Sequence, residues 1–303
     1  MVRKWITAVC LLFVCILSVF TFRPITASAD MGPKPSVTVK FENMPSGLCY
    51  GTLLSDDSST GPFSAWRGGE YYDHDDVGEE IFFKFVRYQD IDGYYFLQRV
   101  WTLNEKPTID WTYYPPNNFK ILLYFPDSDV FVCSGIYDKY AFDSYYTVDM
   151  SGVDLTQAEN GVLWKNNGGM RVYIDYNYTH EIFGLIARVV ITLAVELLFA
   201  LAFKFKGKKA FLFIVGVNLL TQVALNVALH FIYLSAGRLA FILAYVGLEF
   251  LIFNVEYIFY AIFLPKLLPQ KRKAGVYVLY SLAANAVSFV VGMGLSLIWP
   301  GIF

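Results

Sequence analysis

Residues 182–203 read IFGLIARVVITLAVELLFALAF, an apolar run with only two charged side chains, Arg188 and Glu196. A helix needs about 20 predominantly apolar residues to cross the hydrocarbon core of a bilayer. Three further runs of this length follow, at residues 210–234, 239–264 and 274–299. The connections between the runs are short, so neighbouring helices must run antiparallel. Residues 181–303 are therefore predicted to form a four-helix transmembrane bundle, with the lipid bilayer as its partner.

Charge and hydropathy divide the chain into two halves. The 303 residues have a mean hydropathy of +0.44 and yet include 24 basic and 26 acidic side chains. Residues 30–180 contain 22 acidic and 11 basic residues, whereas residues 181–303 contain 4 acidic and 10 basic ones. Such segregation indicates an acidic soluble domain, residues 30–180, joined to a membrane domain.

The basic residues of the membrane half predict its orientation. Eight of them occupy the first and third connections between the predicted helices, whereas the second connection carries one, Arg238. Cytoplasmic loops are enriched in Lys and Arg, so both basic connections are expected in the cytoplasm. Residues 30–180 and the C-terminal Phe303 then lie outside the cell. The eight residues are Lys204, Lys206, Lys208, Lys209, Lys266, Lys271, Arg272 and Lys273.

The first 29 residues have the order of an export signal. Arg3 and Lys4 precede an apolar core at residues 6–22, and Ala27-Ser28-Ala29 ends the segment. This pattern predicts a signal peptide that is cleaved after Ala29. The core is also long enough to remain as an uncleaved anchor. Both outcomes place Asp30 outside the cell.

Short β-branched and aromatic runs alternate with turn residues in the domain that follows. Asp92-Gly93 is a strong hairpin signal between two such runs, and Pro126-Asp127-Ser128-Asp129 is a weaker one. Strands at this spacing favour an all-β antiparallel sandwich or an open barrel. Residues 127–133 resemble part of an immunoglobulin strand, so an immunoglobulin-like sandwich is preferred. The runs are residues 37–41, 81–86, 94–97, 119–125, 130–132 and 172–174.

Two cysteines, Cys49 and Cys133, remain once the leader is set aside. An exported domain permits one disulfide between them, but two buried free thiols are an equally good reading. Neither reading implies redox chemistry or a metal site, because no Cys-x-x-Cys pair or metal-ligand spacing accompanies them.

An acidic segment is the one candidate for cation binding in the outer domain. Carboxylates on flexible backbone are suitable Ca²⁺ ligands. The EF-hand pattern fails, however, because Val77 and Lys84 occupy ligand positions counted from Asp73. A solvated acidic loop is therefore the preferred interpretation. The residues are Asp73, Asp75, Asp76, Glu79 and Glu80, with Asp56 and Asp57 upstream.

Adjacent tyrosines mark a surface of the outer domain that could bind a ligand. Neighbouring residues of a strand point to opposite faces, so one tyrosine of each pair is expected to face outward. Exposed tyrosines suit sugars, peptides or partner proteins, and they also occur as ordinary residues of a sheet face. The pairs are Tyr71-Tyr72, Tyr94-Tyr95, Tyr113-Tyr114 and Tyr145-Tyr146.

Polar residues near the middle of the predicted helices form the sharpest functional hypothesis. Counted from the basic connections at 1.5 Å per residue, Glu196, Asn218 and Glu256 lie about 12–14 Å deep. A charged side chain at this depth costs at least about 2.5 kcal/mol. It therefore indicates a proton or cation path or a polar cavity, or else protonated glutamates that hydrogen-bond across helices. The predicted cluster is Glu196, Asn218, Gln222, Asn226, Glu249, Glu256 and Asn285.

Catalytic and nucleic-acid functions find no support in the sequence. His74, His180 and His230 are its only histidines, and no nucleophile elbow, zinc-binding motif or phosphate loop is present. No enzymatic activity and no cofactor are therefore predicted. No segment outside the predicted cytoplasmic connections is basic enough to bind nucleic acid, and residues 30–180 have twice as many acidic as basic residues.

Three segments resemble a group of uncharacterised membrane proteins from Gram-positive bacteria. They are residues 30–37 (DMGPKPSV), 111–116 (WTYYPP) and 218–222 (NLLTQ). The resemblance implies the same layout and a location in the bacterial cell envelope. The first functional hypothesis is a non-enzymatic envelope protein whose outer domain binds a ligand, a second copy or another envelope protein. The alternative is a small ion- or proton-coupled transporter or channel that uses the intramembrane glutamates.

Overall fold

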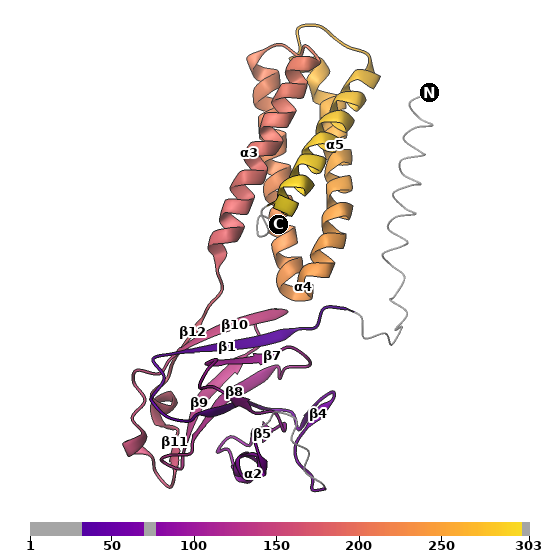
Figure 1. Cartoon of the computed structure of the whole chain (residues 1–303). Coiled ribbons are helices and arrows are strands. Elements are labelled where there is room, and N and C mark those ends of the chain that lie inside the picture. Colours follow the sequence, from indigo (N-terminus) through magenta and orange to yellow (C-terminus); the bar gives the residue numbers. More distant parts are fainter. Residues whose placement is uncertain (1–31, 70–76, 299–303) are drawn as a thin grey trace. The chain divides into compact units, whose positions relative to one another are not determined.

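The computed structural model describes residues 32–69 and 77–298. Residues 34–303 belong to one compact unit. It consists of a β-sheet region followed by long helices (Figure 1). The predicted order of a β-rich domain and a helical domain is therefore confirmed. The predicted signal peptide lies outside the described residues.

The β region contains two main sheets. One has four strands in the order β12-β10-β1-β7, and the other has six, with β11-β9-β8-β2-β5 in order and β6 paired to β2. Both contain a parallel pair, β1 with β10 and β9 with β11, so the prediction of a purely antiparallel fold is wrong. The strands are β1 (Ser36–Glu42), β2 (Tyr50–Ser55), β5 (Tyr95–Phe96), β6 (Trp101–Thr102), β7 (Thr108–Trp111), β8 (Asn118–Phe125), β9 (Val130–Asp138), β10 (Asp143–Asp149), β11 (Val162–Leu163) and β12 (Arg171–Ile174).

Short elements complete this region. β3 and β4 form a separate two-stranded sheet, and two 3-10 helices follow β10. They are β3 (Ser59–Thr60), β4 (Phe63–Ser64), η1 (Leu155–Gln157) and η2 (Lys165–Gly169).

One apolar core joins the two large sheets. Strand β1 alternates buried and more exposed residues, and it contributes Val37 and Val39 to this core. Trp111 of β7 belongs to the same cluster, as do Ile121 and Leu123 of β8 in the other sheet. Side chains from facing sheets that share one core define two packed layers. The sequence correctly predicted packed sheets, although it did not predict the pairing.

Helix α2 (Glu79–Arg87) corrects the prediction of a strand at residues 81–86. Its buried residues Phe82 and Phe85 are three apart, which places them on one side of a helix. Glu79 and Glu80 in its first turn and Lys84 and Arg87 in its last turn complement the helix dipole. The helix packs on the face of the six-stranded sheet opposite the four-stranded one (Figure 1).

The two predicted hairpin turns have opposite outcomes. The turn at residues 126–129 joins β8 to β9, and its Asp129 N–H donates to the Pro126 carbonyl at 3.2 Å. The turn at Asp92-Gly93 follows a helix instead of a strand, so it is not a hairpin turn. Gly93 still supplies the positive φ, 78°, that the turn requires.

Cys49 and Cys133 are free, buried thiols. The predicted alternative of a disulfide between them is therefore wrong. The reason is positional, because Cys49 belongs to the core between the sheets, whereas Cys133 belongs to the cluster beneath α2. The six-stranded sheet separates the two thiols.

Three helical elements form the C-terminal part: α3 (Tyr178–Ala202), α4 (Lys208–Leu267) and α5 (Ala274–Ile298). Among the described residues, these three are long and apolar enough to cross a membrane. Helix α4 has 60 residues, but Gly237 is not helical, with φ 74° and ψ −173°.

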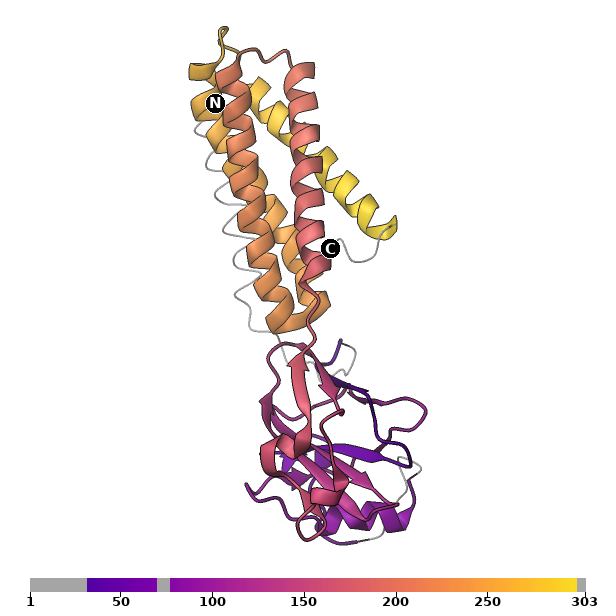
Figure 2. The ribbon, with the colours of Figure 1, turned by 90° about the vertical axis from the view of Figure 1, so that its left-hand side faces the viewer.

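The two halves of α4 run side by side. Asn218 donates a hydrogen bond to Tyr260 at 2.7 Å, although the two are 42 residues apart. A straight helix would separate them by about 63 Å at 1.5 Å per residue. The element is thus a helical hairpin that turns at Gly237 (Figures 1 and 2), and the count of four helical segments agrees with the prediction.

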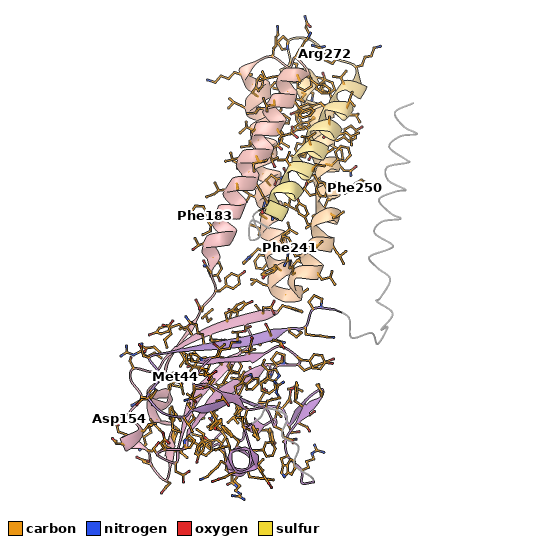
Figure 3. The ribbon with its side chains drawn as sticks, in the orientation of Figure 1. Met44, Asp154, Phe183, Phe241, Phe250 and Arg272 are labelled. Atoms are coloured by element: carbon orange, nitrogen blue, oxygen red, sulfur yellow. The ribbon has the colours of Figure 1, made fainter. Side chains whose placement is uncertain are left out.

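The helical bundle is apolar on its outside. Leu198, Leu220 and Val290 are 65%, 70% and 66% exposed, and the labelled Phe183 and Phe250 also lie on the outer surface (Figure 3). By contrast, Glu196, Asn218 and Glu256 are wholly buried. An apolar exterior around polar residues is the arrangement that a membrane-spanning bundle requires.

Both basic connections lie at one end of the bundle. Helix α3 ends there, α4 begins and ends there, and α5 begins there (Figures 1 and 2). Gly207 of the first connection lies close to Leu267 and Pro269, where the third connection begins, so the two connections are neighbours. The bend of α4 is at the opposite end (Figure 1), and Arg238 follows Gly237 in this bend.

Candidate functional site: a buried carboxyl pair among the helices

Two glutamates from different helices meet at one amide. The Asn285 side chain of α5 donates to Glu256 Oε2 of α4 at 2.8 Å and lies 3.5 Å from Glu196 Oε1 of α3. The same Nδ2 donates to the Ser281 carbonyl at 3.1 Å. An amide nitrogen has two hydrogens for these three acceptors, so the longest contact, to Glu196, is the weakest.

Two hydroxyls complete the surroundings of the carboxylates. Tyr280 donates to Glu196 Oε2 at 2.5 Å, and Thr221 donates to Glu256 Oε1 at 2.6 Å. Within residues 32–69 and 77–298, no ion pair links either carboxylate to a basic side chain. Both glutamates are fully buried. Two carboxylates in this setting need protons, because a buried charge is costly when it has no partner of opposite sign.

Asn218 lies beside this pair with an unsatisfied oxygen. Its Nδ2 donates to the Ile214 carbonyl at 3.0 Å and to Tyr260 Oη at 2.7 Å, which uses both amide hydrogens. Its Oδ1 is buried without a hydrogen-bond partner. The Thr221 hydroxyl lies 3.1 Å from the Asn218 backbone carbonyl and 2.6 Å from Glu256 Oε1. The Ser281 hydroxyl is a second buried group without a partner.

A second polar layer surrounds Arg188. Arg188 donates to Asn226 Oδ1 at 2.9 Å and lies over the rings of Phe241 and Tyr245. It is 8% exposed, so its side chain lies inside the bundle. Glu249 is close enough to interact electrostatically with Arg188 and Tyr245.

The structure therefore divides the predicted polar cluster into two groups. Glu196, Asn218, Glu256 and Asn285 meet in the carboxyl pair, to which Thr221, Tyr260 and Tyr280 are added. Asn226 and Glu249 belong to the layer around Arg188 instead. Gln222 is buried, and its backbone carbonyl accepts a hydrogen bond from the Asn226 side chain at 2.8 Å. Tyrosines within apolar runs were not recognised from the sequence, because their periodicity resembles that of core aromatics.

The acidic segment of the outer domain offers no cation site in the described part of the chain. Asp73, Asp75 and Asp76 lie outside the described residues, while Glu79 and Glu80 begin α2. No group of three or more His, Cys, Asp or Glu residues that could hold a metal occurs in residues 32–69 and 77–298. Upstream, Asp56 accepts a hydrogen bond from Asn118 at 2.7 Å.

A buried ion pair in the outer domain was not predicted. Lys120 Nζ of β8 lies 2.9 Å from both oxygens of Asp90 and 2.5 Å from Asp92. The side chains of Lys120 and Asp90 are 3% and 0% exposed. A lysine within the apolar run 119–125 was the only signal in the sequence. The cluster also contains Cys133, whose Sγ lies 3.6 Å from Asp90, and burial raises the pKa of this thiol to about 12.

Among the described tyrosine pairs, Tyr145-Tyr146 is the one that lies entirely within a strand, β10, and it alternates as predicted, whereas Tyr71-Tyr72 lies outside the described residues. Tyr95 and Tyr145 are 44% and 39% exposed, whereas Tyr146, next to Tyr145, is buried. Tyr114 is also exposed. Each exposed ring is available to a partner, but the rings lie on different elements.

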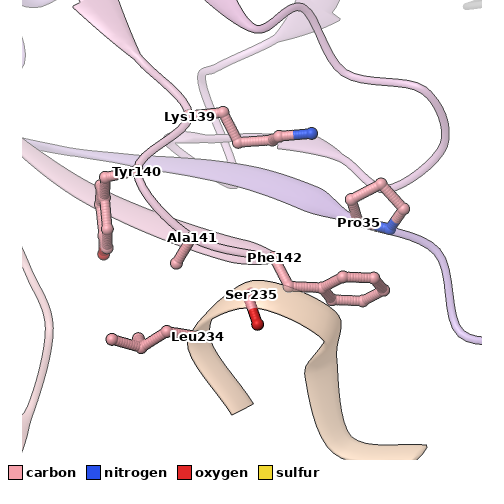
Figure 4. A pocket seen from close by; sticks show the side chains of 7 residues that line it. All are labelled: Pro35, Lys139, Tyr140, Ala141, Phe142, Leu234 and Ser235. Carbon is pink, nitrogen blue, oxygen red and sulfur yellow. The ribbon is translucent and has the colours of Figure 1, made fainter. Parts of the chain in front are cut away.

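A small pocket is lined by seven residues, of which only Lys139 is charged (Figure 4). Phe142 N–H donates to the Leu234 carbonyl at its edge, at 2.6 Å. The lining contains no carboxylate, histidine or cysteine, so we assign no chemistry to it. The other lining residues are Pro35, Tyr140, Ala141 and Ser235.

In comparisons with family models, curated proteins and solved structures, nothing matches this chain.

Proposed function

We propose that the chain is an integral membrane protein of the cell envelope with its β domain outside the cell. The clustering of basic residues supports this orientation, because eight of them lie at the end of the bundle where α3 ends. The β domain precedes the start of α3, at the other end of this helix. By the positive-inside rule, the basic end is cytoplasmic. The leader is then the export signal, and the C-terminus is extracellular.

The outer domain is proposed to be the binding part of this envelope protein. Two sheets that share one apolar core form a packed scaffold that holds the surface side chains of this domain in place. Exposed rings such as Tyr95, Tyr114 and Tyr145 supply contact area at low entropic cost. The partner in this proposal is an extracellular ligand, another envelope protein or a second copy of the chain.

Labelling of intact cells with a membrane-impermeant maleimide tests the orientation. Ser151→Cys, in an exposed turn of the β domain, should react from outside, whereas Lys206→Cys and Lys273→Cys should react only after lysis. The native thiols Cys49 and Cys133 are buried and should add little background. Labelling of Lys206→Cys in intact cells, with Ser151→Cys protected, would reverse the proposed orientation.

A second candidate function, a small proton- or ion-coupled transporter or channel, rests on the carboxyl pair. Glu196 and Glu256 come from different helices and meet at Asn285 without a basic partner. Intramembrane carboxyl groups that face a bundle interior are common in proton relays. A purely structural role would need only hydrogen bonds, which glutamine also makes.

Transport is tested in sealed liposomes that contain a pH-sensitive dye. Glu196→Gln and Glu256→Gln should abolish proton flux driven by a membrane potential. Asn254→Ala is the matched control, because Asn254 donates to the Phe250 carbonyl of its own helix, away from the pair. Flux that is equal in wild type, both glutamine variants and protein-free liposomes would exclude this function.

A further inference from the structure

Eight exposed basic side chains lie together at one end of the helical bundle. They come from the end of α4 and from the first and third connections, which are neighbours at Gly207 and Pro269. The labelled Arg272 marks this end (Figure 3). Residues 197–248 and 257–303 contain no aspartate or glutamate, and both glutamates of the carboxyl pair are buried. In the part of the chain that the structure describes, no ion pair joins any of the eight to a carboxylate.

Two helix N-termini add to the positive potential of this end. Helix α4 begins at Lys208, and α5 begins at Ala274, directly after Lys273; neither first turn contains an acidic residue. A helix N-terminus carries roughly half a positive charge and favours anions, so basic residues are unfavourable there. Only Lys266, in the last turn of α4, and Lys204, just after α3, lie at helix C-termini, where a cation is favourable. The other six lie in or just before the first turns of α4 and α5 and are here called the basic rim: Lys206, Lys208, Lys209, Lys271, Arg272 and Lys273.

The basic rim needs an anion to offset its own repulsion. Consecutive residues such as Lys271, Arg272 and Lys273 are closer together than the Debye length of about 8 Å at physiological salt, so solvent ions screen their repulsion only in part. A bound anion offsets this repulsion and is attracted by both helix N-termini. Phosphate suits this set of donors, because lysine contributes charge and the Arg272 guanidinium can bind two oxygens at once.

Exposed apolar side chains lie beside these cations. Leu201, Ile262 and Leu279 are all exposed, and each is within two helical turns of one of the eight basic residues. A molecule with an anionic phosphate and apolar chains can contact both surfaces, whereas a free phosphate or an acidic peptide contacts only the charged one. Basic clusters next to transmembrane helices attract anionic lipids in this way.

We propose that the basic rim binds the phosphate headgroup of an anionic phospholipid of the membrane that the bundle spans. The acyl chains lie against the exposed apolar surface of the helices, and the headgroup offsets charge from both connections at once. A headgroup shared by both connections also ties α4 to α5, which carry Glu256 and Asn285 of the carboxyl pair. The site rests on the proposed insertion of the chain into a membrane, and it is independent of the orientation and of transport.

Site-specific fluorescence quenching tests the proposal with the full chain in phosphatidylcholine liposomes. Gln270→Cys, an exposed position beside the basic rim, carries a thiol-linked fluorophore, while the native thiols are buried. Spin-labelled phosphatidylglycerol should bind at this position more tightly than spin-labelled phosphatidylcholine by roughly fivefold or more, the effect of a single cation near the surface, and high salt should reduce the difference. The same fluorophore at Ser235→Cys, at the bend of α4, should be quenched nearly equally by the two lipids.

The outcomes separate the lipid site from membrane insertion. Equal quenching by both lipids at Gln270→Cys would overturn the lipid site and leave insertion intact. Absence of quenching by either lipid at both positions would contradict insertion itself. Both leaflets contain both lipids, so a reversed orientation changes neither result.

Two variants of equal net charge separate the basic rim from a general attraction of charge. The rim variant should lose the preference for phosphatidylglycerol and keep its quenching at Ser235→Cys, which shows that it is still inserted. It combines Lys206→Gln, Lys208→Gln, Lys209→Gln, Lys271→Gln, Arg272→Gln and Lys273→Gln. The control variant changes six exposed residues of the outer domain and should keep the wild-type preference. It combines Lys40→Gln, Arg67→Gln, Arg87→Gln, Lys106→Gln, Lys165→Gln and Arg171→Gln.

A third variant guards against misfolding of the rim variant. Replacement of the five rim lysines by arginine keeps every charge and should keep the preference. A preference that persists in the rim variant, or that is lost equally in the control variant, would overturn the proposal. Displacement of phosphatidylglycerol by inorganic phosphate at constant ionic strength would identify a site for a free anion instead of a lipid.

Discussion

Replacement of Lys120 by Met should destabilise the outer domain strongly. The ammonium group contacts both oxygens of Asp90 at 2.9 Å, and the two side chains are 3% and 0% exposed. The substitution therefore leaves Asp90 buried without its cation. Removing one partner of a buried ion pair typically costs 3–5 kcal/mol, against a total stability of about 5–15 kcal/mol for a domain.

The assay is thermal unfolding of the full chain in detergent, followed by tryptophan fluorescence from the β domain. A loss of 3–5 kcal/mol corresponds to a fall in Tm of roughly 6–20 °C at about 2–4 °C per kcal/mol. Lys120→Met/Asp90→Asn should recover much of this loss, because the neutral amide no longer buries a charge and can still accept from the Asp92 and Tyr94 N–H groups.

Lys40→Met is the matched control. Lys40 pairs with Glu42 at 2.8 Å on the surface, where both side chains are about half exposed. Surface pairs contribute little to stability, so this variant should unfold like wild type. Equal Tm values for Lys120→Met, Lys40→Met and wild type would refute the reasoning from burial.

Three further predictions concern the outer domain. Cys49 and Cys133 should both react with a thiol reagent in denaturant without reductant. In the folded chain at pH 7 both should resist the reagent, because burial raises the pKa of each thiol to about 12. Absence of reaction in denaturant would indicate a disulfide. The unfolded thiols lose their protons near pH 9, whereas the folded ones keep them to about pH 12. The free energy of unfolding, measured with urea, should therefore fall between pH 9 and 12 by up to about 1.4 kcal/mol per pH unit for each thiol. Cys133→Ala should reduce this slope. Phe85→Ala should cost about 3–5 kcal/mol in the same assay, because Phe85 is fully buried beneath the sheet, whereas Arg87→Ala at the exposed end of α2 should cost far less.

The sequence predicted the membrane half well because its signal is long and simple. Apolar runs separated by basic connections indicate both the helices and their number. The α4 hairpin followed from Arg238 and its neighbours, although Gly237 as the site of the bend did not. The depth count placed Glu196, Asn218 and Glu256 near one level, and the structure brings Glu196 and Glu256 together at Asn285.

The outer domain was harder to predict because its signals are local and compete with tertiary packing. Residues 81–86 are aromatic and β-branched, which favours a strand, yet the spacing of Phe82 and Phe85 places both against the sheet only in a helix. Arg188 lies within an apolar run, and the sequence does not show that Asn226 and two aromatic rings contact it inside the bundle. Both outcomes depend on partners far away in the sequence.

A map of the full chain in a lipid nanodisc, obtained by electron cryomicroscopy with an antibody fragment bound to the β domain, tests the central claim most directly. It should place the Asn285 amide within hydrogen-bonding distance of Glu256, with Glu196 and Tyr280 in contact beside it and all four enclosed by α3, α4 and α5. A map in which Glu196 or Glu256 faces lipid, or in which Asn285 contacts neither carboxylate, would contradict the account.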